Sequence, residues 1–215
     1  MLNKLQKNTA KFLLFFTLSL PFSIIVAETN KLPIISGVGG NFSAINGEGN
    51  NIEFKDYAGK VIVLAFGYTN CADICPFTLG YLKQLYNELL EDEKKQTNII
   101  FVTIDPQYDT PKHLNEFVHF FNKDFIGLSG SKEQIATITS LYQAEFSDLS
   151  KEKVTTKSIR RTTPQKSDDE NEKASLFSHT VILYLIDKKG LTRSLEYTGT
   201  PKKDFARKIR SLLNE

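Results

Sequence analysis

The feature that most constrains the fold of this chain is a pair of cysteines between an apolar run and an amphipathic stretch. Residues 61–66 (Val-Ile-Val-Leu-Ala-Phe) are uninterrupted apolar sequence, which predicts a buried strand. Cys71 and Cys75 follow, separated by three residues, and they are the only cysteines in the sequence. Pro76 then opens a stretch with apolar residues at helical spacing. The sequence therefore predicts two thiols brought together where a strand gives way to a helix, which indicates copper or redox chemistry.

Helix signals recur along the chain. The first predicted helix covers residues 76–94, where leucines and a tyrosine fall on one face. Thr110–Pro111 predicts the start of a helix ending near residue 122, with proline at the first helical position. Ser131 and Gln134 form a capping-box pattern for a helix ending near residue 142, and Thr200–Pro201 is expected to cap a last helix ending near residue 213.

Strand signals alternate with these helices. Turn-rich sequence at 46–51 predicts an N-terminal β-hairpin within residues 42–54. Further strands are predicted at residues 61–68, 98–105, 125–128, 180–187 and 191–197. Alternating strands and helices predict an α/β fold with a mostly parallel central sheet, and the last two strands add an antiparallel edge. The expected architecture is thioredoxin-like, with an N-terminal β-hairpin extension.

Residues 1–27 have the pattern of a targeting segment. Lys4, Lys7 and Lys11 form a basic start, and residues 12–26 are uncharged and largely apolar. The sequence therefore predicts export, with residues 28–215 as one domain on the periplasmic side of the inner membrane. An uncleaved anchor that leaves the domain membrane-associated is the alternative, because residues 12–27 fall just short of the roughly 17–25 residues that span a bilayer.

The charge and composition of the chain limit the kinds of partner that it can bind. The net charge of +2 includes the three lysines of residues 1–27, so nothing in the domain indicates a nucleic-acid partner. The 40% hydrophobic content supplies a core that does not depend on a disulfide. Residues 151–173 are polar, with no apolar periodicity, and predict a flexible insertion that is either a solvated loop or a docking arm.

The spacing and position of the cysteines favour chemistry over structure. Backbone N–H groups at the start of a helix stabilise a thiolate, and for the Cys75–Pro76 pair this predicts a lowered thiol pKa. Two thiolates are soft donors that favour Cu(I), and an added imidazole would extend the site to Cu(II). A structural disulfide between Cys71 and Cys75 is the plainer reading, but so short a loop gains little stability from closure.

Three histidines could supply the imidazole. His113 and His119 fall within the helix after Pro111, where surface or partly packed positions are expected. His179 precedes a predicted central strand, and in a thioredoxin-like topology the residue entering that strand faces the cysteine pair. Asp105 and Asp109 follow the strand at 98–105, at the sheet edge where α/β ligand sites form, and are candidates to orient the site.

Taken together, these motifs resemble the Sco/SenC family of copper metallochaperones. The resemblance is carried by residues 66–76, residues 105–111, and His179–Thr180 leading into residues 184–190. It implies a thioredoxin-like protein that delivers copper to the binuclear site of cytochrome c oxidase, or keeps the cysteines of that site reduced. It implies Cys71, Cys75 and His179 as ligands of Cu(I) or Cu(II). The implied partners are the copper-bearing subunit of the oxidase or another copper chaperone.

Other functions remain open from the sequence. A periplasmic thiol-disulfide oxidoreductase would use Cys71 and Cys75 as a redox-active pair and would not need His179. A peroxiredoxin-like thiol would turn over peroxide at one of these cysteines. The sequence is therefore compatible with a thiol-disulfide reductase activity, and a metallochaperone is the leading hypothesis.

Overall fold

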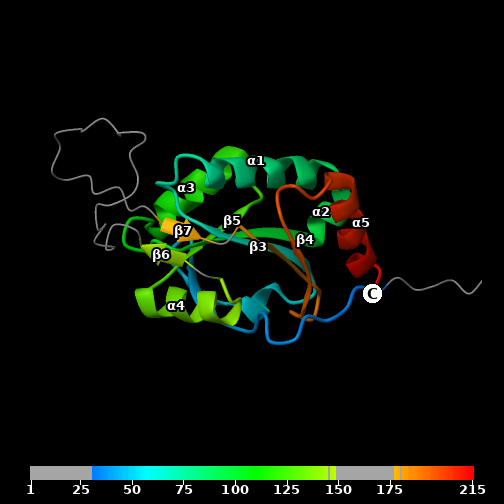
Figure 1. The fold of residues 1–215 in the computed structure, drawn as a ribbon, viewed down its shortest axis with the longest axis horizontal. Coiled ribbons are helices and arrows are strands. Elements are labelled where there is room, and N and C mark those ends of the chain that lie inside the picture. Colours follow the sequence, from blue (N-terminus) through cyan, green and yellow to red (C-terminus); the bar gives the residue numbers. More distant parts are fainter. Residues whose placement is uncertain (1–30, 145, 149–176, 180) are drawn as a thin grey trace, which may run out of the picture. The chain divides into compact units, whose positions relative to one another are not determined.

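A seven-stranded mixed β-sheet forms the centre of the computed structural model (Figure 1). The structure describes residues 31–144, 146–148, 177–179 and 181–215, and side chains only outside residues 145–180. The predicted targeting segment and the predicted insertion at 151–173 therefore lie outside the described residues. No helix in the described part of the chain is both long and apolar enough to cross a membrane.

The centre of the sheet is parallel, as the alternating sequence pattern predicted. β3 (Val61–Gly67) pairs with β4 (Thr97–Thr103), and β4 pairs with β5 (Ile126–Ser129), all in parallel. Every residue of β3 and β4 is buried, which explains why β3 and the centre of β4 are apolar runs rather than alternating sequences. The carboxyl ends of these strands consequently meet at one edge of the sheet, which is called here the carboxyl edge.

Antiparallel strands complete the sheet on both sides. β8 (Leu183–Ile186) pairs with β3, and β9 (Thr192–Glu196) pairs with β8. On the far side, the predicted N-terminal hairpin is present as β1 (Ser43–Asn46) and β2 (Asn51–Glu53), and β1 joins the sheet by pairing with β5. The strand order β2-β1-β5-β4-β3-β8-β9 confirms the expected α/β class.

Helices cover both faces of the sheet (Figure 1). α1 (Ile74–Asn87), α3 (Pro111–Phe121) and α5 (Lys202–Leu213) lie on one face, and α4 (Lys132–Leu141) lies on the other. The 3-10 helix η1 (Phe54–Tyr57) shares an aromatic cluster with Tyr142, which directly follows α4. The loop that carries Cys71 connects the buried strand β3 to α1, which packs on the same sheet.

The prediction of one helix over residues 76–94 is wrong. α1 ends at Asn87, and a separate short helix, α2 (Glu91–Lys95), follows it. Leu90 has an extended backbone, and its N–H donates to the carboxylate of Glu93 at 2.8 Å, so α2 has its own start. Arg210 of α5 also binds Glu93, at 2.8 Å. The helical periodicity of the sequence gives no sign of these contacts at Glu93.

The helix-start signals had mixed outcomes. Thr110 caps α3 by accepting from the backbone N–H of His113, and Ser131 and Gln134 form the predicted capping box of α4. The predicted cap of α5 by Thr200 is wrong, because Pro201 is the N-cap residue and no side chain caps this helix. The Thr200 hydroxyl instead donates to buried Glu196, at 3.0 Å.

One strand pair was not predicted. β6 (Phe146–Asp148) and β7 (Phe177–His179) pair antiparallel as a separate two-stranded sheet. The predicted strand at 180–187 begins only at Leu183, so His179 ends β7 and does not enter the central sheet directly. These two strands flank the part of the chain in which the insertion was predicted.

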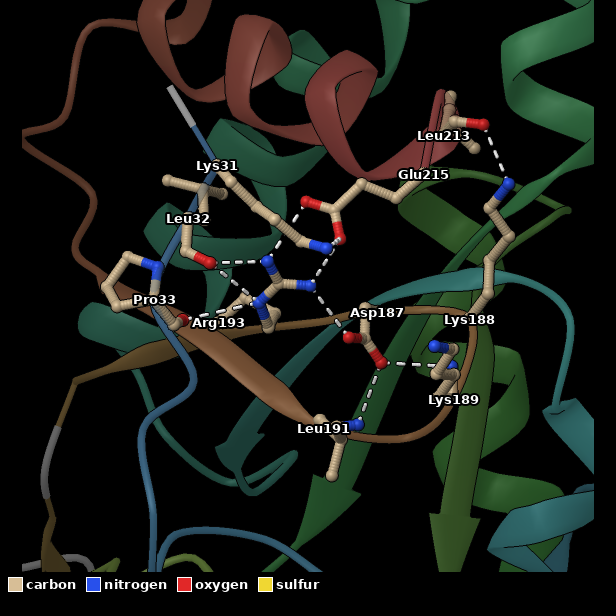
Figure 2. Close-up of polar contacts among 10 residues, drawn as sticks. All are labelled: Lys31, Leu32, Pro33, Asp187, Lys188, Lys189, Leu191, Arg193, Leu213 and Glu215. Atoms are coloured by element: carbon tan, nitrogen blue, oxygen red, sulfur yellow. Dashed lines mark hydrogen bonds and ion pairs between the residues drawn. The ribbon is translucent and has the colours of Figure 1, made fainter. Parts of the chain in front are cut away.

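A buried arginine joins the two ends of the described domain (Figure 2). The Arg193 side chain is 3% exposed, and its Nη1 lies 2.9 Å from Asp187 Oδ2 and 2.8 Å from Glu215 Oε2. Its Nε also donates to the carbonyl oxygens of Leu32 and Pro33, at 3.0 and 3.3 Å. The guanidinium therefore binds the β8–β9 hairpin, the end of the chain after α5, and the segment that leads into the domain.

Candidate metal and redox site

The two cysteines lie at the carboxyl edge, as the strand-to-helix junction predicted. Cys71 is in the loop after β3 and is partly exposed, whereas Cys75 is in the first turn of α1 and is 1% exposed. Both are free thiols, and a hydrogen bond joins their side chains. The pair therefore presents one sulfur to the outside and keeps the other in the core.

The start of α1 acts on Cys71, not on the cysteine within the helix. Burial alone would raise the pKa of the Cys71 thiol. The backbone N–H groups of Asp73, Cys75 and Ile74 and the Cys75 thiol all donate to this sulfur, and together they lower its pKa below the ordinary value. Cys71 is consequently the sulfur more readily present as a thiolate, which is the form that attacks disulfides and binds soft metals.

Cys75 has the opposite character, which corrects the expectation for the Cys75–Pro76 pair. Burial raises the pKa of the Cys75 thiol well above its ordinary value, and the adjacent Cys71 and the charge of Asp109 add to the effect. Its sulfur lies against the end of β3, where a Cβ on Gly67 would come within 2.8 Å of Sγ and would also overlap the Phe101 ring. Glycine at position 67 is therefore what lets this sulfur pack against the strand.

The acidic candidates both lie at the carboxyl edge and are buried. Asp105 is 6% exposed and Asp109 is fully buried. The Asp109 carboxylate accepts from the Thr69 backbone N–H at 3.0 Å, from the Thr103 hydroxyl at 2.6 Å and from the Thr69 hydroxyl. Burial raises the pKa of Asp109 despite these three hydrogen bonds, and the neighbouring Asp105 adds to the rise.

The histidines are placed differently. His179 is the last residue of β7, four residues before β8, whose first residue pairs with Ala65 near the end of β3. The backbone therefore brings His179 toward the carboxyl edge, and its side chain lies outside the described residues. His113 and His119 are both exposed on α3. Among the described side chains, no group of three histidine, cysteine or acidic residues converges as a metal site.

Sequence reasoning did not predict the contacts of three residues of this region. Thr69 and Thr103 bind Asp109, and the His113 Nε2 lies 3.1 Å from the Thr69 hydroxyl. The parallel register pairs Gly67 with Thr103, so Thr69 emerges beside the loop that carries Asp109. Thr103 as the last residue of β4 and Thr69 two residues after β3 were the available signal. The contact of His113 with Thr69 had no local signal, because the two residues are 44 positions apart.

The fold and the cysteine pair define the class of protein first. A thioredoxin-like domain with two free, hydrogen-bonded cysteines at the carboxyl edge, one of them with a lowered pKa, belongs among thiol-based metal or redox proteins. The family follows from sequence comparison. The SCO1/SenC family model matches residues 35–214, and the chain belongs to this family.

Individual relatives agree with this assignment. The chain is 26% identical over 200 residues to the SCO2-like protein of Rickettsia prowazekii, covering 87% of this chain and 89% of that protein. The crystal structure of yeast Sco1 with copper bound has a TM-score of 0.66 at 26% identity, covering 83% of this chain and 90% of that one. The structure of BsSco, described as having a disulfide switch and as a member of the Sco family of cytochrome c oxidase assembly proteins, shares the fold at a TM-score of 0.58, covering 85% of this chain and 98% of that one at 21% identity.

Proposed function

We propose that this protein is an exported copper chaperone that binds copper through Cys71, Cys75 and His179 and delivers it to the binuclear copper site of cytochrome c oxidase. The observation that carries the proposal is the contact between the two sulfurs, since one copper ion can replace the proton that they share. Membership of a family with a copper-bound member supports the choice of metal. The oxidase as recipient rests on the family resemblance.

The unequal thiols suggest an order of binding. Cys71 is partly exposed and has the lowered pKa, so its thiolate is the first donor that copper meets. The Cys75 thiol then loses its proton to complete the pair, and copper binding therefore releases protons. Two thiolates suit Cu(I), and the His179 imidazole would add the nitrogen donor that Cu(II) prefers. Release to a partner would proceed by exchange of these ligands one at a time.

The same asymmetry favours a second candidate, a thiol-disulfide oxidoreductase that keeps the oxidase cysteines reduced. The Cys71 thiolate would attack a partner disulfide, form a mixed disulfide and expel one partner thiolate. Cys75, once deprotonated, would attack the Cys71 sulfur, expel the partner's second sulfur and leave a Cys71–Cys75 disulfide. Two electrons pass to the partner, and His179 has no part in the exchange.

Copper binding by the reduced protein separates the two functions. The protein is loaded with Cu(I) or Cu(II) beside the Cys71→Ser and His179→Ala variants, with His119→Ala as a matched control. One copper per chain that is lost in Cys71→Ser, with only the Cu(II) form lost in His179→Ala, supports the chaperone. Absence of retained copper, with fast exchange against a model disulfide that survives His179→Ala, overturns the chaperone and leaves the reductase.

A further inference from the structure

A chain of polar side chains runs from the surface of α3 to the buried end of β4. His113 Nε2 lies 3.1 Å from the Thr69 hydroxyl, and that hydroxyl donates to Asp109. The other carboxylate oxygen of Asp109 accepts from the Thr69 N–H and from the Thr103 hydroxyl. The chain thus ends on a residue that is fully buried, and it begins on one that is exposed.

The proton count fixes the direction of each bond. The Thr103 oxygen accepts from the Asp105 N–H at 2.9 Å, so its own proton goes to Asp109. Asp109 accepts three hydrogen bonds in this arrangement, so its carboxyl group acts only as an acceptor here. The Thr69 hydroxyl has one proton, which it gives to Asp109, so it can only accept from His113. The His113 Nε2 must therefore carry a hydrogen.

The carboxylate at the centre of this chain is itself held firmly. The Asp109 N–H donates to the Asp105 carbonyl oxygen at 2.9 Å, and the Asp109 carbonyl accepts from the Ser129 hydroxyl at 2.8 Å. Ser129 ends β5 and Thr103 ends β4, so Asp109 is tied to two strand ends. Thr69 lies two residues before Cys71, and both its backbone N–H and its hydroxyl donate to the Asp109 carboxylate.

We propose that Asp109, and His113 acting through Thr69, are positioning residues that fix the loop carrying Cys71 in the geometry that receives copper. The inference deepens the proposed function and rests on it for the role of Cys71. Neither residue touches the metal in this account. They hold the loop in the binding geometry before copper arrives, so that less conformational freedom is lost when the ligands close around the ion.

The tautomer of His113 tests the chain without copper. Nitrogen NMR of the reduced, metal-free full-length protein should show the Nε2–H form at His113. In Asp109→Asn, the amide nitrogen would donate to the Thr69 oxygen and free the Thr69 proton for His113, so the tautomer should switch to Nδ1–H. His119, exposed on the same helix, is the internal control and should not change. An unchanged His113 tautomer in Asp109→Asn would overturn the chain.

Threonine variants test the positioning itself. In Thr69→Val, relaxation of the Cys71 amide in the metal-free protein should show a more mobile loop, and Thr69→Ser should restore its order. Cu(II) affinity should fall roughly fivefold in Thr69→Val, the size expected for one net hydrogen bond, with a shifted sulfur-to-copper absorption band. His113→Ala should give a smaller effect of the same kind, and His119→Ala none.

The outcomes separate the two proposals. A Cys71 amide as ordered in Thr69→Val as in the unsubstituted protein, or Cu(II) affinity within twofold with an unchanged absorption band, overturns the positioning role. Failure of the unsubstituted protein to bind copper overturns the proposed function instead. In that case the relaxation measurement still decides whether these residues fix the loop.

Discussion

Replacing Arg193 with methionine should cost the folded state about 3–5 kcal/mol, the range measured when one partner of a buried ion pair is removed. Methionine keeps much of the aliphatic stem, so the loss reports the guanidinium and not the packing. The variant leaves the Asp187 carboxylate 8% exposed without its cation, although the Lys189 and Leu191 N–H groups still donate to it at 2.9 and 3.0 Å. It also leaves the Leu32 and Pro33 carbonyl oxygens without their donor (Figure 2).

Urea denaturation of the reduced protein, followed by circular dichroism, measures this loss at pH 7. Adding Asp187→Asn to Arg193→Met should recover part of it, because the second change removes the uncompensated buried charge. Glu215→Gln alone should cost less, since its side chain is 24% exposed. A loss below about 1 kcal/mol, or no recovery in the double variant, would show that the guanidinium is not the stabilising group that its contacts indicate.

The same network predicts a dependence on pH. A hydrogen bond from Arg193 lowers the pKa of Glu215 below its ordinary value. A carboxyl group with a lowered folded-state pKa adds stability above its unfolded pKa, about 4.3, and loses that stability as the pH falls through the folded value. The difference in stability between the unsubstituted protein and Arg193→Met should therefore shrink below about pH 4.

Three further predictions concern α1 and the cysteine pair. Gly80 lies inside α1 with open space around it, so Gly80→Ala should stabilise the fold by about 0.5–1 kcal/mol and raise the melting temperature in calorimetry. Gly67→Ala should destabilise it by about 1–3 kcal/mol in the same assay and weaken copper retention, because its Cβ would meet the Cys75 sulfur. Alkylation of Cys71 should stay fast at pH values where ordinary thiols react slowly, because the pKa of Cys71 is lowered. Cys75→Ala should move the midpoint of the rate–pH profile upward, because it removes the thiol that donates to the Cys71 sulfur. Equal rate–pH profiles in the two proteins would contradict this prediction.

The fold could be predicted from the sequence because its core strands are local signals. Residues 61–66 are a continuous apolar run, and residues 98–104 are apolar apart from Asn98 and Thr103, as expected of strands buried on both faces. The helix predicted between them indicated a parallel crossover. The break before α2 could not be predicted in the same way. Leu89 and Leu90 continue the apolar pattern, and only the contacts at Glu93 reveal that the helix ends.

The candidate site shows the same division. The position of the cysteines at the carboxyl edge followed from the local sequence pattern. The opposite pKa shifts of the two thiols did not follow from it. Helix N–H groups reach back to Cys71, whereas burial against Gly67 governs Cys75, and both facts depend on three-dimensional packing. Arg193 likewise gave no sequence signal, because its partners lie up to 161 residues away.

The shared guanidinium of Arg193 also makes the domain suited to circular permutation. The Leu32 carbonyl oxygen lies 3.0 Å from Arg193 Nε and the Glu215 carboxylate 2.8 Å from Nη1, so a short linker can join the two ends without stretching either. New ends could open at the exposed turn before Gly49, in the β1–β2 hairpin. Because Arg193 lies beside the β8–β9 turn, at the end of the sheet away from the cysteines, the permuted chain would leave the carboxyl edge free for a partner.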